Sequence, residues 1–409
     1  MLKKLLCLLI LSTSSFAQYT SADLDLAGTT FERKFDKKIL EKYISSRLPS
    51  NINAALLSMS SAQDTSLIPF ILRPDYGKFG SMIAFALGET GPNPVSESFL
   101  LEKIISGRYP ENQHAAFEAL GRCGSQESLN SIVTRYFSNS EFKSDGISVA
   151  LAGFSARGIK TVDTFEVKVL MKELSNSRNS IKRKAEAAFA ASRIGINKSA
   201  KNDLLKLLFE KHEDEVGLVL KQYILASLRR MRQGPDSPEQ IKSLLTHREW
   251  RIRTEAAKLI ASLPVKTSET LRLYFTLFTD KNPNVSRQAA ISLKDMKIDS
   301  SLTFLLKEEL KNALLNSTVT PNTAGELFIA YCGFSSEDIF GQIDKLKGRI
   351  RPDFIYRALT ANNTNPSRNL NYLLTATDPS NKNEKLEHLN AVLSLQKSLP
   401  GNSQIVNYL

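Results

Sequence analysis

Two stretches of sequence 33 residues apart decide the fold. The first is L-T-H-R-E-W-R-I-R-T-E-A-A-K-L, from Leu245 to Leu259, and the second is F-T-D-K-N-P-N-V-S-R-Q-A-A-I-S, from Phe278 to Ser292. In each, a polar turn leads to a branched apolar residue, and a pair of alanines follows about one helical turn later. Apolar residues at this spacing form one face of a helix, and small side chains on that face let a neighbouring helix approach closely. The pattern predicts a repeated helix that packs against copies of itself.

The same step of 33 residues occurs earlier, where F-A-L-G-E-T-G from Phe85 to Gly91 recurs as E-A-L-G-R-C-G from Glu118 to Gly124. Further alanine-rich segments continue the series at intervals of roughly 30 to 37 residues, the range of helix-pair repeats. They lie at 53–57, 148–152, 186–191, 222–226 and 324–330. We therefore predict an all-α fold, a right-handed α-solenoid of about nine or ten antiparallel helix pairs over residues 35–361.

Units of this length with the pattern D-x-x-x-x-V-x-x-x-A-A-x-x-L resemble HEAT repeats, particularly the short kind called PBS-lyase-type. The resemblance covers most of the chain. It implies a stack of helix pairs that serves as a binding surface, and it implies no particular reaction.

A narrower likeness is carried by A-F-A-L-G-E-T-G at 84–91 and E-A-L-G-R-C-G at 118–124. These segments are similar to the N-terminal HEAT half of some exported bacterial cyclophilin fusions, which end in a β-barrel peptidyl-prolyl isomerase domain. This chain departs from that pattern, because nothing after Ala361 has the length or strand pattern of such a barrel.

The first residues read as an export signal. Met1-Leu2-Lys3-Lys4 is positively charged, a run of apolar residues follows from Leu5 to Leu11, and Ser15-Phe16-Ala17 supplies small residues at a cleavage site. We expect cleavage after Ala17 and a periplasmic or extracellular protein. No later stretch is long and apolar enough to cross a membrane.

Both ends of the predicted solenoid differ from it in composition. Residues 18–34 form a polar lead, and residues 362–409 form a loop-rich tail that contains one amphipathic helix from Leu386 to Leu399. We expect this helix to cap the last repeat. The tail as a linker toward a further domain is the alternative.

After cleavage, Cys123 and Cys332 remain. Each ends an apolar helical segment, so we expect two buried free thiols. The four histidines and the single His212-Glu213 dipeptide lack the spacing of a metal site. We therefore predict no catalytic, metal or cofactor-binding residues, and no enzyme. Nucleic acid is not an expected partner, because export removes it and Trp250 is the only tryptophan.

The formal charge of +12 points to an anionic partner. Arg183, Arg253 and Arg287 each precede the alanine-rich stretch of their unit, which would place them on one ridge of a regular stack. The competing interpretation is that each arginine pairs with a turn carboxylate such as Asp280. The candidate partner-binding residues are Lys182, Arg183, Trp250, Arg251, Arg253 and Arg287.

The sequence as a whole predicts an exported, non-catalytic HEAT-repeat scaffold that binds a protein or an anionic polymer on a basic concave surface. The alternative is the repeat half of an exported cyclophilin-type peptidyl-prolyl isomerase whose enzyme domain lies outside this sequence.

Overall fold

The computed structural model describes residues 36–399 except 161–164, 265, 335–338, 347, 363–364 and 377–381, and it also describes residues 22, 25–27 and 30. The expected export signal at 1–17, most of the polar lead at 18–34 and the end of the tail lie outside the described residues. The chain forms two compact units, one that ends at Ile196 and one that begins at Asn197.

All regular elements of the first unit are helical in its described part. Its α-helices are α3 (Lys37–Ile44), α4 (Pro49–Ala62), α5 (Ile68–Ile71), α6 (Tyr76–Glu89), α7 (Pro94–Ser106), α8 (Gln113–Cys123), α9 (Gln126–Ser138), α10 (Ile147–Ala156), α11 (Phe165–Ser175) and α12 (Ile181–Ile194).

The regular elements of the second unit are also helices in its described part. Its α-helices are α13 (Lys201–Phe209), α14 (Glu215–Met231), α15 (Pro238–Leu245), α16 (Trp250–Ser262), α17 (Ser268–Phe275), α18 (Pro283–Ser292), α19 (Thr303–Leu315), α20 (Pro321–Phe334), α21 (Phe340–Leu346), α22 (Pro352–Ala361), α23 (Pro366–Ala376) and α24 (Lys382–Lys397).

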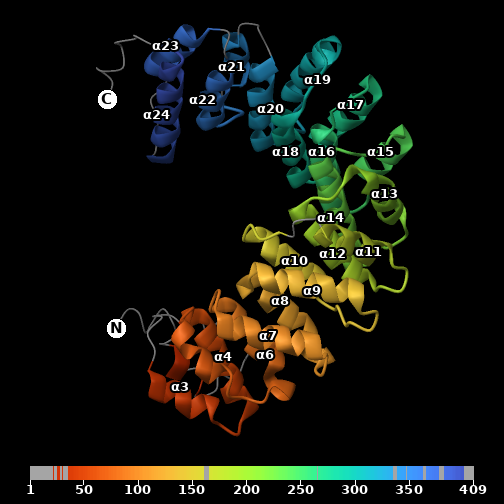
Figure 1. Ribbon diagram of the computed structural model, residues 1–409. Coiled ribbons are helices and arrows are strands. Elements are labelled where there is room, and N and C mark those ends of the chain that lie inside the picture. Colours follow the sequence, from red (N-terminus) through yellow and green to blue (C-terminus); the bar gives the residue numbers. More distant parts are fainter. Residues whose placement is uncertain are drawn as a thin grey trace. The chain divides into compact units, whose positions relative to one another are not determined.

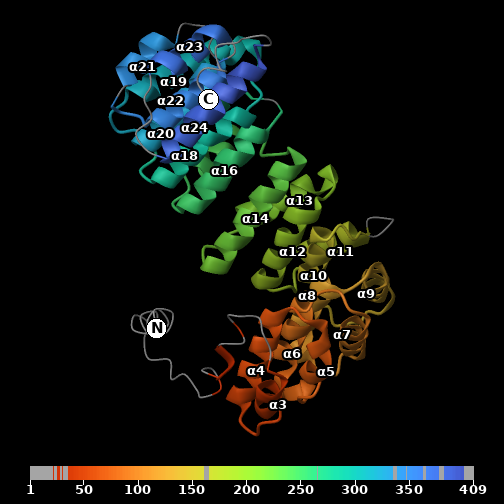
Figure 2. The same cartoon turned by 90° about the vertical axis from the view of Figure 1, so that its left-hand side faces the viewer.

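Within each unit the helices pack in the order in which they occur in the sequence. The even-numbered helices form one row, in which α6 contacts α8 and α16 contacts α18 (Figures 1 and 2). The odd-numbered helices form a second row, in which α7 contacts α9 and α15 contacts α17. Members of the two rows also pair with each other, as α7 does with α8 and α15 with α16. The prediction of an all-helical chain with sequentially packed helices is confirmed.

The polar breaks in the sequence are helix starts. Ser237 precedes α15 and accepts a hydrogen bond from the Gln240 backbone N–H, and Asn282 does the same for α18 through the Asn284 N–H. A proline fills the first position of both helices, where its missing N–H costs no hydrogen bond. These caps fix where the two helices begin, and with it the face that each helix buries.

Glycine sets the spacing between the even-numbered helices of the first unit. Gly88 and Gly121 occupy the same place in the two copies of the motif noted above. A Cβ on Gly121 would lie 2.7 Å from the carbonyl oxygen of Ala150 in α10, and a Cβ on Gly88 would lie 3.0 Å from the Cα of Ala119 in α8. Gly153 faces Gly121 from the other helix, and its Cβ would lie 2.8 Å from Gly121 backbone atoms. The repeated glycine therefore permits backbone-to-backbone packing that no side chain would fit.

We predict that Gly121→Ala destabilises the packing of α8 on α10 by about 2 kcal/mol, because the added methyl group overpacks a contact made by backbone atoms. Amide hydrogen exchange in these two helices measures the effect, since protection reports local stability within a chain of two units. Gly333→Ala is the control, because nothing lies within 4 Å of a Cβ at that position. Equal protection in both variants would contradict the packing role.

Candidate functional site

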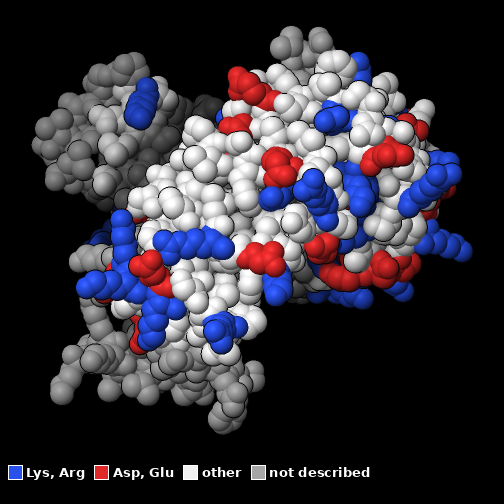
Figure 3. Space-filling view, turned by 60° about the horizontal axis from the view of Figure 1, so that its bottom comes forward, with Lys and Arg blue, Asp and Glu red and all other residues white. Residues whose placement is uncertain are grey.

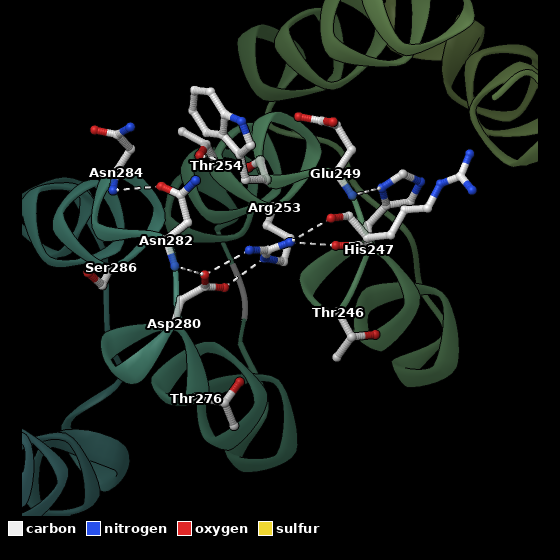
Figure 4. Close-up of polar contacts among 12 residues, drawn as sticks. Thr246, His247, Glu249, Arg253, Thr254, Thr276, Asp280, Asn282, Asn284 and Ser286 are labelled. Carbon is white, nitrogen blue, oxygen red and sulfur yellow. Dashed lines mark hydrogen bonds and ion pairs between the residues drawn. The ribbon is translucent and has the colours of Figure 1, made fainter. Parts of the chain in front are cut away.

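Arg253, one of the arginines expected on a basic ridge, is buried and fully engaged by the protein. Its Nε and Nη2 donate to the two carboxylate oxygens of Asp280 at 2.6 and 2.7 Å, and its Nη1 donates to the backbone carbonyls of His247 and Arg248 at 2.7 and 3.2 Å (Figure 4). Asp280 also accepts from the Asn282 N–H at 2.8 Å. The guanidinium thus ties the turn before its own helix to the turn of the following pair. For Arg253 the contact agrees with the competing interpretation of the sequence, in which the arginine pairs with the turn carboxylate of Asp280.

Arg183 has a comparable structural role in the first unit. Its Nη2 donates to Glu173 Oε1 at 2.9 Å and to Ser144 Oγ at 2.5 Å, and its Nε donates to Glu173 Oε2. Glu173 is buried, and it also accepts from the hydroxyl of Tyr136 at 2.5 Å. Arg183 therefore neutralises a carboxylate in the interior, and little of its charge is left for a partner.

Arg253 and Arg287, two of the arginines expected on one ridge, do not occupy equivalent positions in the second unit. Arg183 is the third residue of α12, Arg253 is the fourth of α16 and Arg287 is the fifth of α18. Successive helix positions turn by about 100°, so the side chains of Arg253 and Arg287 leave their helices in different directions. Ser286, not Arg287, occupies the position equivalent to Arg253, and it is buried. The step of 33 residues from Arg253 therefore leads to Ser286 and not to Arg287, which lies one position further along α18.

The remaining candidates lie at the protein surface. Lys182 and Arg287 are exposed, and no ion pair of either side chain is found among the described residues. Arg251 pairs with Glu215 and Glu249 through contacts of 2.5 and 3.0 Å. Trp250 is 38% exposed at the first position of α16. Lys182, Trp250 and Arg287 are therefore accessible to a partner, whereas Arg251 must first give up its carboxylates.

On the face of the molecule drawn in Figure 3, lysine and arginine side chains are interspersed with aspartate and glutamate. Wide areas between them carry neither sign of charge. Exposed pairs of this kind contribute little to stability and create no strong field at a distance.

We predict that Asp280→Ala destabilises α16 and α18 by about 3 kcal/mol, because it leaves the buried guanidinium of Arg253 without its carboxylate. Glu215→Ala is the matched control, since it removes an exposed partner of Arg251 and should cost less than about 1 kcal/mol. Hydrogen exchange of the amides in both helices compares the two. A similar small loss in both variants would show that the buried pair is not a structural tie.

The ridge hypothesis missed a cluster of positive charge that lies at the C-terminal ends of three even-numbered helices of the second unit. A hollow of about 440 Å³ opens where α14, α16 and α18 end. Of its described lining residues only Asp295 is acidic. Lys258 pairs with Glu255 at 2.6 Å, and the other four cations have no ion pair among the described residues. The five lining cations are Arg229, Arg232, Lys258, Lys294 and Lys297.

The sequence held a signal for this cluster. Arg229 and Arg232 follow the apolar stretch of one repeat, and Lys294 and Lys297 follow the alanine pair of a later one. Basic residues at a helix C-terminus are common, because they compensate the helix dipole. These residues surround one hollow because α14, α16 and α18 all end on the same side of the second unit. The packing order of the helices determines this, and no single segment of the sequence shows it.

Arg232 adopts an unusual backbone conformation beside this hollow. It follows α14 with φ of 53°, in the left-handed region. Glycine is the usual residue at such a helix end, because a side chain there costs roughly 1 kcal/mol. Its side chain is exposed and lines the hollow. The chain thus has a guanidinium where glycine would be less strained.

The cysteines and histidines are expected to have no catalytic role. Cys123 and Cys332 are buried free thiols, as predicted, and burial raises the pKa of the Cys123 thiol to about 12. His212 contacts Glu210, and His388 is buried against a backbone carbonyl. Within the described part of the chain, no three His, Cys, Asp or Glu side chains come together as metal ligands would. None of its helices combines the length and apolarity needed to span a bilayer.

His114 has the environment of a pH-sensitive group. Its Nε2 lies 3.0 Å from Glu186 Oε1, and this hydrogen bond raises the pKa of the imidazole above its ordinary value of 6.5, although burial opposes the change. A raised pKa means that the charged form stabilises the first unit. That contribution is fully present below pH 6.5 and is lost as the pH rises through the folded-state pKa.

We predict that an NMR titration of the His114 ring gives a pKa above 6.5, and that Glu186→Gln returns it toward that value. The protection of α8 amides should fall as the pH rises through the His114 pKa in the unmodified chain and change less in the variant. A His114 pKa that the substitution does not alter would rule out the carboxylate as the cause.

The structure therefore defines an all-helical protein of sequentially packed helices, with buried ion pairs at its turns and a basic hollow in its second unit. Comparison with models of known protein families finds no match, and no curated protein is similar enough in sequence to count as a relative.

Proposed function

We propose that this chain is an exported, non-catalytic scaffold of HEAT-like helix pairs that holds an anionic partner through lysine and arginine side chains. The partner is an anionic polymer or an acidic protein surface. The helix pairs are proposed to form a right-handed stack of about nine or ten pairs over residues 35–361. The binding site we assign is the basic hollow at the ends of α14, α16 and α18.

The observation that carries the proposal is a difference in how the cations are used. Arg183 is bound to the buried carboxylate of Glu173, and the buried Arg253 to the largely covered carboxylate of Asp280, so the charge of both arginines is compensated within the protein. Arg229, Arg232, Lys294 and Lys297 gather around a hollow without ion pairs among the described residues. Uncompensated charge that converges on a concave surface attracts and retains an opposite charge more strongly than dispersed pairs do.

The composition of the hollow favours binding over a reaction. Its described lining offers ammonium, guanidinium, hydroxyl and amide donors, and it includes no histidine or cysteine. Such a set can hold oxygen anions by charge-assisted hydrogen bonds, and it lacks the acid–base pair that a hydrolytic site requires.

We predict that the full chain is retained on immobilised heparin at low salt and released at high salt. The reason is that lysine and arginine side chains release the small cations condensed on the heparin, and added salt opposes this release. The variant Arg229→Gln, Lys294→Gln, Lys297→Gln should elute at clearly lower salt. Arg178→Gln, Lys242→Gln, Lys281→Gln is the matched control, since it removes the same charge from three other exposed positions. It should elute nearly as the unmodified chain does.

Immobilised polyglutamate tests the acidic-protein form of the partner in the same way. Failure of the unmodified chain to bind either resin would overturn the proposed function. Equal effects of the two variants would show that binding follows net charge and not the hollow. Sequencing the N-terminus of the protein recovered from the periplasm or the medium tests export, with Gln18 as the expected first residue.

A further inference from the structure

A second hollow adjoins the basic one in the same unit. It measures about 340 Å³ and shares Ile291 and Lys294 with the basic hollow. Its two remaining charged residues, Glu326 and Arg357, pair with each other at 3.2 Å, so they add no net charge. The rest of its described lining is apolar or glycine: Ala290, Ile329, Ala330, Gly333, Phe334 and Ala361.

Lys294 lies at the junction of the two hollows. Its exposed side chain has an apolar stem and a charged end, so it can border an apolar surface and a polar one at once. Ile291 provides continuous apolar surface from the second hollow into the first. The two hollows therefore form one groove that is basic at one end and apolar at the other.

The charge of the basic end can be estimated. Its five lining cations face Asp295 and the Glu255 that pairs with Lys258, which leaves a formal excess of three. The C-termini of α14, α16 and α18 each contribute about −0.5 of a charge, which reduces the excess to about +1.5. A phosphate monoester carries about −1.5 to −2 at neutral pH. One such group therefore matches the field of this end.

We infer that the groove is a binding site for an anionic amphiphile, a molecule with one phosphate or sulfate head and a single hydrocarbon chain. The head lies among Arg229, Arg232, Lys294 and Lys297, and the chain lies along Ile291 and Ile329. This inference rests on the proposed function for the head, since both use the basic hollow. It adds the apolar hollow, which a bare anion or a uniformly charged polymer leaves unused.

The physical reason for one combined ligand is that neither end is sufficient alone. An exposed cluster of cations holds a small anion weakly in salt, because counterions compete for it. An open apolar hollow of this size removes only part of a short chain from water. A molecule that joins the two groups gains both contributions while it loses its translational freedom only once.

The test is a calorimetric titration of the full chain with inorganic phosphate and with ethyl, butyl, hexyl and octyl phosphate below their micelle concentrations. Affinity should rise by about twofold to fourfold for each added methylene, because burying one is worth up to about 0.8 kcal/mol. Octyl glucoside, which has the chain but no charge, should bind at least tenfold more weakly than octyl phosphate. Long-chain sulfates in place of phosphates separate the two possible head groups.

Two variants separate the ends of the groove. Ile329→Ser should reduce the dependence on chain length and leave the affinity for ethyl phosphate unchanged. Lys294→Gln, Lys297→Gln should weaken binding of every phosphate by tenfold or more, while Lys242→Gln, Lys281→Gln changes none of them. Circular dichroism of each variant confirms that the helices are retained.

An affinity that is independent of chain length in the unmodified chain would overturn the inference. Retention on heparin would then still support the proposed function, so the two failures are distinguishable. Equal binding of octyl phosphate and octyl glucoside would also overturn it, because the cations would have no part in recognition. A chain-length dependence that Ile329→Ser leaves intact would show that the hydrocarbon lies elsewhere.

Discussion

The close approach of neighbouring second helices is the constraint on which the rest of the structure depends. An even-numbered helix must bury surface against the even-numbered helices before and after it as well as against the odd-numbered helix with which it pairs. Small residues make this possible: alanines fill the inner face of α12, and Gly121 meets Ala150 and Gly153 by backbone atoms alone. Because every helix depends on its neighbours in the row, stability is shared along each unit and is not concentrated in one central core.

Buried ion pairs follow from this arrangement. Turns between helices bring backbone carbonyls and carboxylates close to the interior, and Arg253 and Arg183 satisfy them where water cannot. Such arginines contribute positive charge to the composition but offer almost none to a partner. The net charge of a repeat protein therefore says less about its binding surface than the subset of cations left without carboxylates.

The helical class and the sequential packing could be predicted from the sequence, because the alanine pairs at 256–257 and 289–290 recur with a fixed period and the period reflects packing. The polar turn before each of these alanine pairs also precedes a helix, which starts at Trp250 in α16 and at Pro283 in α18. The site could not be predicted in the same way. Arg253 is buried and Arg287 is exposed because their positions along their helices differ by one residue, which turns the side chain by about 100°. The hollow depends on where three separate helices end. The motif Phe85–Gly91 showed a repeat but not that Gly88 is needed for backbone contact.

The position of the basic hollow has a consequence for how such a protein can evolve. Its cations lie in or just beyond the last turns of successive helices, outside the alanine faces that hold the row together. Substitutions there change what the surface attracts without disturbing the spacing of the helices. Duplication of one helix pair would copy its terminal cations and lengthen the groove by one step. The cations of the hollow and the residues that pack the helices are thus separate positions in and just after α14, α16 and α18, so selection can act on one set while the other stays constant.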